Sequence, residues 1–219
     1  MLKVNEKFVS INGEGPHSGM LAVFIRFAGC NLQCSYCDTQ YAANLTTAEH
    51  KEESVEDIMS YIEEQGIINV VLTGGEPLLQ QQSELLRLIE NLSARGYKVD
   101  IETNGSIDIL PYRDIACIIM DYKLPMSGME EWMCIENLQH LKNSDVVKFV
   151  CSTEKDLNRA YELIQEHDLT KKVKVFLSPV FGMIDPLAIV EYMKQKKLNN
   201  VTLQLQLHKI LWDPQVRGV

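Results

Sequence analysis

Short β-branched runs recur along this chain of 219 residues, and helical patterns lie between most of them. Strands that alternate with helices are typical of a parallel sheet with its helices on the outside. The strand-like runs are LAVFIRFA (21–28), NVVLT (69–73), KVDIET (98–103), IACIIMDY (115–122), DVVKFV (145–150), KVKVFL (172–177) and NVTLQLQL (200–207). These are fewer strands than a closed α/β barrel contains. The pattern predicts a partial, open α/β barrel, with a doubly wound open sheet as the second choice.

Two of the segments between these runs carry clear helix boundaries. SVEDIMSYIEEQG has an N-cap at Ser54 and a stop at Gly66, and DPLAIVEYMKQKK has Pro186 near its start and lysines at its end. Two more helices are predicted over SELLRLIENLSARG and STEKDLNRAYELIQEH, whereas the crossover at 104–114 is short and broken by Pro111. Because no Pro/Gly-rich linker or break in composition divides the chain, we expect residues 1–219 to form a single domain.

Composition narrows the range of partners. The formal net charge is −9 and the pI is near 5.1, which argues against a broad binding surface for nucleic acid or an anionic membrane. No apolar run approaches the length of a membrane-spanning helix, and the first residues lack the apolar core of a secretory signal. Three of the six cysteines are clustered, and Cys117, Cys134 and Cys151 stand alone, unlike the spread of a disulfide framework. We therefore expect a cytoplasmic protein that binds neither nucleic acid nor membrane.

Polar and glycine-rich groups follow each predicted strand. The carboxyl ends of parallel strands meet at one edge of an α/β sheet, where active sites form. The seven segments in question are the cysteine loop after residue 28, TGGEP (73–77), ETNG (102–105), DYKLP (121–125), CST (151–153), SPVFG (178–182) and QLHK (206–209). Any one of them is explained by an ordinary turn, but together they predict a shared site.

The segment AGCNLQCSYCDTQYA (28–42) places Cys30, Cys34 and Cys37 in a C-x3-C-x2-C spacing. A structural zinc site needs a fourth ligand, for which the candidates are His17, His50 and Cys134. Three thiolates can instead hold a 4Fe–4S cluster and leave one iron open to a ligand that is not protein. We favour the cluster over zinc.

The cysteine spacing, with Tyr36 directly before the third cysteine, resembles the signature loop of the radical S-adenosylmethionine (SAM) superfamily. TGGEP after the next strand is similar to that superfamily's motif for the methionine end of SAM. The resemblance implies that SAM binds the open iron, and that electron transfer from the cluster splits SAM into methionine and a 5′-deoxyadenosyl radical. It also implies a partial TIM-like barrel of about six core parallel strands with outer helices. The residues expected at the cofactor are Tyr36, Thr73, Gly74, Gly75, Glu76, Asn104, Lys123 and Ser178.

A narrower resemblance covers almost the whole chain. SINGEGPHSG, FIRFAGCNLQC, CDTQYA, ETNG and the closing QLHK…W…P…RGV are similar to the 7-carboxy-7-deazaguanine synthase family. This resemblance implies a radical ring contraction of 6-carboxy-5,6,7,8-tetrahydropterin to 7-carboxy-7-deazaguanine with loss of ammonia, in the route to queuosine. It further implies Mg²⁺ bound through Thr39, a homodimer, and an electron donor of the flavodoxin or ferredoxin type. The chain departs from the family at Asn12, where glutamine is usual.

The expected substrate has a carboxylate and a planar ring with N–H groups. Arg26, on the strand that leads into the cysteine loop, offers a guanidinium suited to a carboxylate, and Glu14 can accept from ring N–H groups. With the three cysteines, these two residues form the predicted catalytic set. The remaining candidates for substrate binding are Asn12, Gly13, Glu102 and His208. The simpler interpretations are an ion pair for Arg26 and a turn-stabilising hydroxyl for Thr39.

Two other functions are compatible with the cysteine spacing. A glycyl-radical-activating enzyme shares that spacing but acts on a protein, whereas the SINGEG opening and QLHK ending favour a small pterin. An interaction module that carries zinc or an Fe–S cluster without catalysis belongs to a different class.

Overall fold

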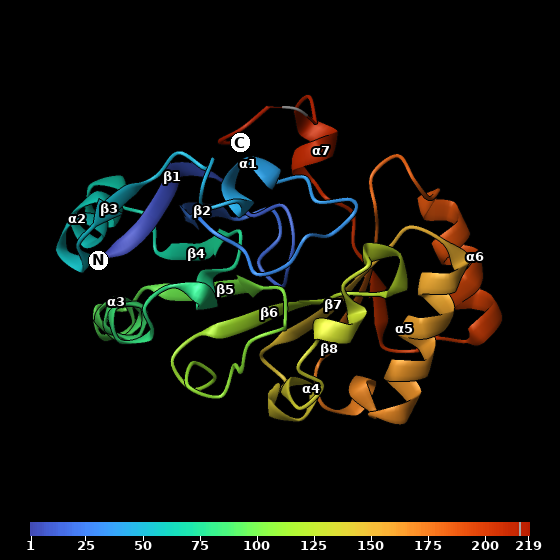
Figure 1. The fold of residues 1–219 in the computed structure, drawn as a ribbon. Helices are drawn as coiled ribbons and strands as arrows, with labels where there is room; N and C mark the ends of the chain where they lie inside the picture. Colours follow the sequence, from blue (N-terminus) through green and yellow to red (C-terminus); the bar gives the residue numbers. More distant parts are fainter. Residues whose placement is uncertain (215) are drawn as a thin grey trace.

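The computed structural model describes residues 1–214 and 216–219. One mixed sheet runs through the molecule in the order β3-β1-β2-β4-β5-β6-β7-β8-β9 (Figure 1). Its strands are β1 (Leu2–Ile11), β2 (Leu21–Phe27), β3 (Lys51–Glu53), β4 (Asn69–Gly74), β5 (Lys98–Thr103), β6 (Cys117–Tyr122), β7 (Val146–Cys151), β8 (Lys174–Pro179) and β9 (Val201–Leu203). The strands from β2 to β9 pair in parallel, apart from β3, which pairs with β1. With β3 and β9 at its edges the sheet is open, which confirms the predicted partial α/β barrel.

All seven predicted strands are present, although β9 ends at Leu203 instead of residue 207. The sequence analysis missed β1 and β3. Strand β1 pairs antiparallel with β2 along most of its length, and β3 pairs with the start of β1. Polar residues interrupt the sequence of β1 (LKVNEKFVSI), so its strand conformation depends on this pairing more than on an apolar run.

The helices are α1 (Gln40–Ala43), α2 (Val55–Gln65), α3 (Gln82–Ala94), α4 (Asn137–His140), α5 (Glu154–Glu166), α6 (Pro186–Lys196) and α7 (His208–Leu211). The four predicted helices correspond to α2, α3, α5 and α6 and are confirmed. Ser54 caps α2 in a reciprocal capping box with Asp57, and Gly66 ends that helix in the left-handed conformation. Between β5 and β6 the described chain has turns in place of a crossover helix, as the break at Pro111 predicts.

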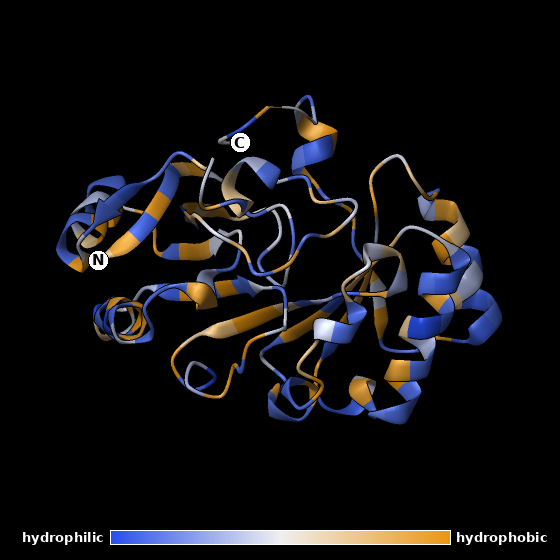
Figure 2. Cartoon of the chain, viewed as in Figure 1, coloured by the Kyte–Doolittle hydropathy of each residue, from blue (hydrophilic) through white to orange (hydrophobic). Residues whose placement is uncertain are grey.

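The two faces of the sheet differ in chemistry. Successive strand residues point to opposite faces, so Ile101 joins the large hydrophobic core beneath the helices while Glu102 points to the inner face. Figure 2 shows apolar residues gathered along the strands and charged residues on the outer helices. Among the described residues, the inner face holds two small apolar clusters, one around Phe24 and one around Ile119. The helix-covered core therefore supplies most of the apolar burial and leaves the inner face available for polar groups.

Among the described residues, no helix combines the length and the apolar character that crossing a bilayer requires.

We expect Ser54→Ala to lower the free energy of unfolding by about 1 kcal/mol, because it removes the hydroxyl that accepts from the Asp57 backbone N–H. Ser60→Ala, at an exposed position inside the same helix, is the matched control. Urea unfolding followed by circular dichroism would measure both. Equal midpoints for the two variants would contradict a stabilising role for the cap.

Candidate active site

A single cavity lies at the carboxyl ends of the parallel strands. Six of the seven predicted polar segments contribute to its lining; the exception is CST, whose Ser152 pairs with Asp156 at the start of α5. The predicted site residues that line the cavity are Gly13, Glu14, Arg26, Cys30, Cys34, Tyr36, Cys37, Thr39, Thr73, Gly74, Gly75, Glu102, Asn104, Lys123 and His208. The geometry thus brings together groups that are spread over most of the chain.

Strand register explains why charged residues meet on the inner face. Arg26 on β2 lies opposite Thr73 on β4, and Asp121 on β6 lies opposite Lys148 on β7. Thr73 donates its hydroxyl to Glu102 Oε2 at 2.7 Å. Burial raises the pKa of Glu102 above its usual value, and the neighbouring Glu14 carboxylate raises it further.

The cysteine loop is held by backbone contacts at both of its ends. Cys30 N donates to Ala43 O at 2.8 Å, and Ser35 N donates to Ser127 O at 3.0 Å. Burial raises the pKa of Cys34 to about 11, although the nearby Lys123 ammonium partly opposes that effect. Asn104 Nδ2 lies 3.6 Å from Cys30 Sγ. Because metal binding requires thiolates, a bound cationic centre must displace the thiol protons.

The three thiols fit a cluster better than a zinc ion. Among the described residues, no group of three or more His, Cys, Asp or Glu side chains is arranged to hold a single metal ion. The proposed fourth zinc ligands are engaged elsewhere: His17 with Asp100, His50 with Ala48 O and Cys134 with Glu136. In a 4Fe–4S cluster each thiolate binds a different iron, which sets the ligands farther apart than around one ion. All three thiols are free and line the same cavity, so they are available to such a cluster.

Gly74 and Gly75 allow the end of β4 to pack against the start of the cysteine loop. A Cβ on Gly74 would lie 2.2 Å from Phe27 O, and a Cβ on Gly75 would lie 2.1 Å from Gly29 O. Gly74 also has a φ of 141°, which other residues rarely adopt. The glycines were predicted for close approach to SAM; in addition, the structure shows that backbone packing beneath the cysteines requires them.

Glu76 is fully buried and does not line the cavity. Its carboxylate accepts from Leu78 N at 2.9 Å, Thr103 Oγ1 at 2.8 Å and Asn104 N at 2.7 Å. Its contacts within the described chain are therefore structural and tie the end of β4 to the end of β5.

Asn12 and Ser178 also lie outside the lining of the cavity. Asn12 accepts from Glu14 N and lies 3.4 Å from Asp100, and Ser178 Oγ is buried without a described partner.

Thr39 stands at the N-cap of α1, yet its hydroxyl makes no capping hydrogen bond. The side chain lines the cavity, with Oγ1 3.7 Å from Cys37 Sγ. The hydroxyl therefore does not cap α1, and its described contact is with the Cys37 thiol two residues earlier. Asp38, next to it, is paired with Lys209 at 2.5 Å and is partly exposed.

Arg26 forms an ion pair through one guanidinium nitrogen and leaves the other two nitrogens without a described partner. Its Nε donates to Glu6 Oε1 at 2.7 Å, and the Tyr41 hydroxyl donates to the same oxygen at 2.9 Å. The two terminal guanidinium nitrogens have no hydrogen-bond partner among the described residues, and the side chain lines the cavity. Those nitrogens form the planar pair that binds a carboxylate through two hydrogen bonds.

The NGEG turn contacts the C-terminal segment. Gly15 N donates to Gln204 Oε1 at 2.8 Å, and Leu207 N donates to Gly13 O at 3.2 Å. A Cβ on Gly13 would lie 2.5 Å from His208 Nδ1, so glycine makes room for this imidazole. Burial lowers the pKa of His208, although Glu14 opposes that effect. The N-terminal and C-terminal motifs thus form one wall of the cavity.

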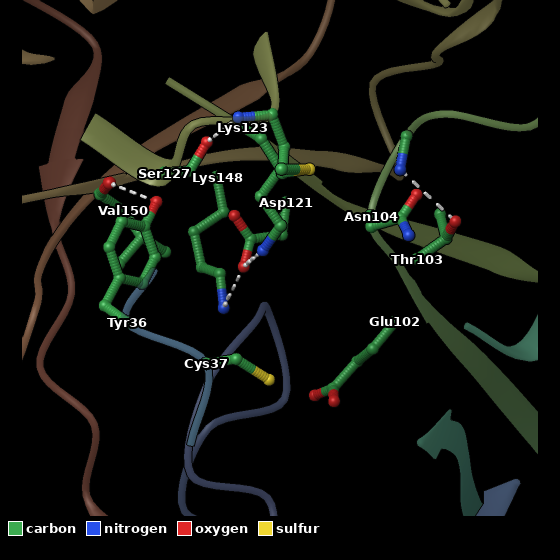
Figure 3. A network of polar contacts seen from close by, with 12 residues as sticks. Tyr36, Cys37, Glu102, Thr103, Asn104, Asp121, Lys123, Ser127, Lys148 and Val150 are labelled. Carbon is green, nitrogen blue, oxygen red and sulfur yellow. Dashed lines mark hydrogen bonds and ion pairs between the residues drawn. The ribbon is translucent and has the colours of Figure 1, made fainter. Parts of the chain in front are cut away.

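Sequence reasoning assigned no role to six charged or polar residues that line the cavity: Asp38, Thr103, Asp121, Lys148, Gln206 and Lys209. Lys148 could have been recognised from the sequence, because it is a charged residue in the middle of the apolar run DVVKFV. Figure 3 shows Lys148 and Lys123 directed toward Asp121, with Cys37 and Glu102 nearby. The C-terminal Val219 also reaches the cavity.

Comparison with known proteins defines the class first. Residues 24–127 match the family model described as the radical SAM superfamily. The solved structure of QueE from Escherichia coli matches with a TM-score of 0.74 and 26% identity, and the match covers 94% of this chain and 93% of that one. The chain therefore has the fold of a radical SAM enzyme.

Relatives that match over the full length of the chain identify the family within the radical SAM superfamily. The chain is 52% identical to 7-carboxy-7-deazaguanine synthase from Clostridium acetobutylicum, with 99% of each protein covered. It is 41% identical to 7-carboxy-7-deazaguanine synthase from Methanospirillum hungatei, covering 97% of this chain and 86% of that protein. The chain belongs to the 7-carboxy-7-deazaguanine synthase family, as its sequence motifs predict.

We expect Gly75→Ala to reduce the iron content of anaerobically reconstituted protein severalfold, because the added Cβ would push the Gly29 carbonyl and with it the cysteine loop. Gly66→Ala is the control, since it adds backbone strain of about 1 kcal/mol at a left-handed position with no atom near the new Cβ. Iron analysis and thermal unfolding of both variants separate the effects. If the two variants lose iron equally, general instability is the cause and not displacement of the loop.

Proposed function

We propose that this protein converts 6-carboxy-5,6,7,8-tetrahydropterin to 7-carboxy-7-deazaguanine and ammonia. One observation carries the proposal: a single cavity contains three free thiols together with the open edge of Arg26 and the Glu14 carboxylate. The names of relatives that match over the full chain support the same reaction.

Recognition of the pterin is assigned to the inner face of the sheet. Arg26 binds the substrate carboxylate through its two terminal nitrogens, while Glu6 holds its Nε and so fixes the plane of the guanidinium. Glu14 accepts from the ring N–H groups, and its Oε1 is buried with no described partner. A buried carboxylate oxygen without a donor is unfavourable, so a ligand N–H there would be stabilising. His208, next to Gly13, hydrogen-bonds the opposite side of the substrate.

The cofactors are assigned to the cysteine loop and its neighbours. Cys30, Cys34 and Cys37 would hold a 4Fe–4S cluster, and Thr39 would offer one oxygen to Mg²⁺, which prefers oxygen ligands and keeps several waters. When bound, the cluster and SAM supply the abstraction of a hydrogen atom, and Mg²⁺ supplies a Lewis acid at the substrate carboxylate. The protein residues position the pterin and exclude water.

The expected contacts to SAM are assigned to the carboxyl ends of β4, β5 and β6. Tyr36, Thr73, Asn104 and Lys123 line the cavity on this side. Glu76 lies outside the cavity lining and positions Asn104 by accepting a hydrogen bond from its backbone N–H. Ser178 remains a predicted contact, with a buried hydroxyl that is available to a ligand.

The alternatives receive less support. The full-length relatives carry the name of a small-molecule synthase and not that of a glycyl-radical-activating enzyme. A zinc-bearing interaction module would need a ligand set that the described residues do not provide.

Four further features are proposed together with the reaction. The whole chain acts as one domain and as a homodimer, and a flavodoxin or ferredoxin supplies the electron. The protein works in the cytoplasm, where a reducing environment suits its six free cysteines.

The decisive experiment incubates anaerobically reconstituted protein with SAM, a strong reductant, Mg²⁺ and the carboxypterin. We expect stoichiometric 7-carboxy-7-deazaguanine, detected by mass spectrometry, and a broad absorbance near roughly 400 nm from the cluster. Cys34→Ala should lose both the colour and the product while remaining folded, whereas Cys134→Ala, outside the cavity, should keep both. A colourless protein that holds one zinc, or 5′-deoxyadenosine formed only as an uncoupled trace, would rule out the proposal.

Thr39→Val tests the magnesium site, because it replaces the hydroxyl with a methyl group of similar size. We expect the Mg²⁺ concentration for half-maximal activity to rise about tenfold or more, with the cluster absorbance unchanged. Thr39→Ser keeps the oxygen and should remain within a few fold of the wild type. An unaltered Mg²⁺ dependence in the valine variant would refute the assignment.

A further inference from the structure

We propose that Lys148 is a positioning residue for pterin recognition: its ammonium occupies one oxygen of Glu14 and leaves the other for the N–H edge of the substrate ring. The inference rests on the proposed function, since it assigns a role within the same site. Neither the motifs of the sequence nor the comparisons point to Lys148.

The position of Lys148 is fixed by the sheet. It lies on β7 opposite Asp121 of β6, on the inner face of the parallel sheet. The residue is buried, with 7% of its surface exposed, in a strand that is otherwise apolar. A buried ammonium is costly unless a charged partner compensates it. The partners here are the carboxylates of Glu14 and, at 3.7 Å, Asp121.

The two oxygens of Glu14 differ in their surroundings. Oε2 accepts a hydrogen bond from the Lys148 ammonium. Oε1 is buried and makes no hydrogen bond of ordinary length among the described residues, although the Gln206 side chain lies close enough to lower the pKa of Glu14. Because Glu14 lines the cavity, the geometry leaves one acceptor for a ligand and fixes the carboxylate through the other.

The charge state of Glu14 depends on Lys148. Burial alone raises the pKa of Glu14, but Lys148, with smaller contributions from Gln206 and His208, brings it below the usual value. Lys148 in turn stays protonated. Burial lowers its pKa, but the carboxylates of Glu14, Asp121 and Glu102 together raise that pKa by more than burial lowers it. Glu102 is the like charge that faces Glu14 from β5.

The sign of the pH effect follows from these groups. Without Lys148, burial and the Glu102 carboxylate both favour the protonated form of Glu14. A protonated Glu14 loses acceptor capacity toward ring N–H groups. If recognition needs the ionised form of Glu14, a variant without Lys148 loses substrate binding at a higher pH than the wild type when the solution is acidified.

The test compares wild type with Lys148→Met and Lys148→Arg. In Lys148→Met we expect the KM for the carboxypterin to rise about tenfold or more at neutral pH, with kcat changed less than KM. The acidic limb of kcat/KM should move up by about one pH unit or more. Lys148→Arg keeps the charge and should restore most of the affinity. Lys174→Met, an exposed lysine at the start of the next strand, is the control for removal of a positive charge.

A double-mutant cycle keeps the test informative if Lys148→Met folds poorly. Glu14→Gln removes the buried negative charge, so the Lys148→Met/Glu14→Gln protein has no unpaired carboxylate at this position. We expect Lys148→Met to add at most about a twofold rise in KM in the Glu14→Gln background. An equal penalty in both backgrounds, or an unmoved acidic limb in the single variant, would overturn the inference.

Binding of 6-carboxypterin, a fluorescent oxidised relative of the substrate, separates this inference from the proposed reaction. A wild type that binds 6-carboxypterin with the predicted Lys148 dependence but forms no deazaguanine would refute the reaction and support the role of Lys148. A wild type that forms deazaguanine, together with a Lys148→Met variant that binds and turns over normally, would refute the role of Lys148 alone.

Discussion

The site depends on the junction where the ends of β2, β4 and β5 are held together beneath the cysteine loop. The buried Glu76 carboxylate accepts from three donors at this junction, and Glu76 N donates to Gly29 O at 2.7 Å. Gly75 brings the two backbones so close that a Cβ would not fit. A charged group without solvent keeps such a position only when hydrogen bonds satisfy it. The cysteine loop therefore begins at a backbone junction that hydrogen bonds and close packing hold in place, which suits the cluster proposed there.

The sheet divides stability and recognition between its two faces. Its outer face packs against α2, α3, α5 and α6 in one large apolar core, which supplies most of the hydrophobic free energy. The inner face can then accommodate charged residues that would destabilise a smaller domain. Those residues are arranged with alternating sign, from Lys123 through Asp121 and Lys148 to Glu14. Alternation lets each buried charge compensate its neighbour while one acceptor remains for a ligand.

The two ends of the chain close the site together. Gln204 bonds to both the N–H and the carbonyl of Gly15, which fastens the NGEG turn to the C-terminal segment. Lys209 pairs with Asp38, and the Arg217 guanidinium lies 3.8 Å from the centre of the Tyr41 ring. Lys209 and Val219 line the cavity, from which water must be excluded during a radical reaction. The structure thus explains why motifs at opposite ends of the sequence belong to one function.

The sequence by itself determined the strand and helix alternation, the helix caps and the three-cysteine loop, because each of these depends on residues close together in the chain. It also indicated most of the cavity lining, since polar groups that follow parallel strands must meet at one edge. Only the tertiary structure decided the rest. Strand β1 needs β2 as a partner, and Glu76 faces the backbone of β5 instead of the cavity. Lys148 gained its role from register with Asp121 and from contact with Glu14, which is 134 residues away in sequence. Such pairings depend on how distant strands align, and local residue patterns do not contain that information.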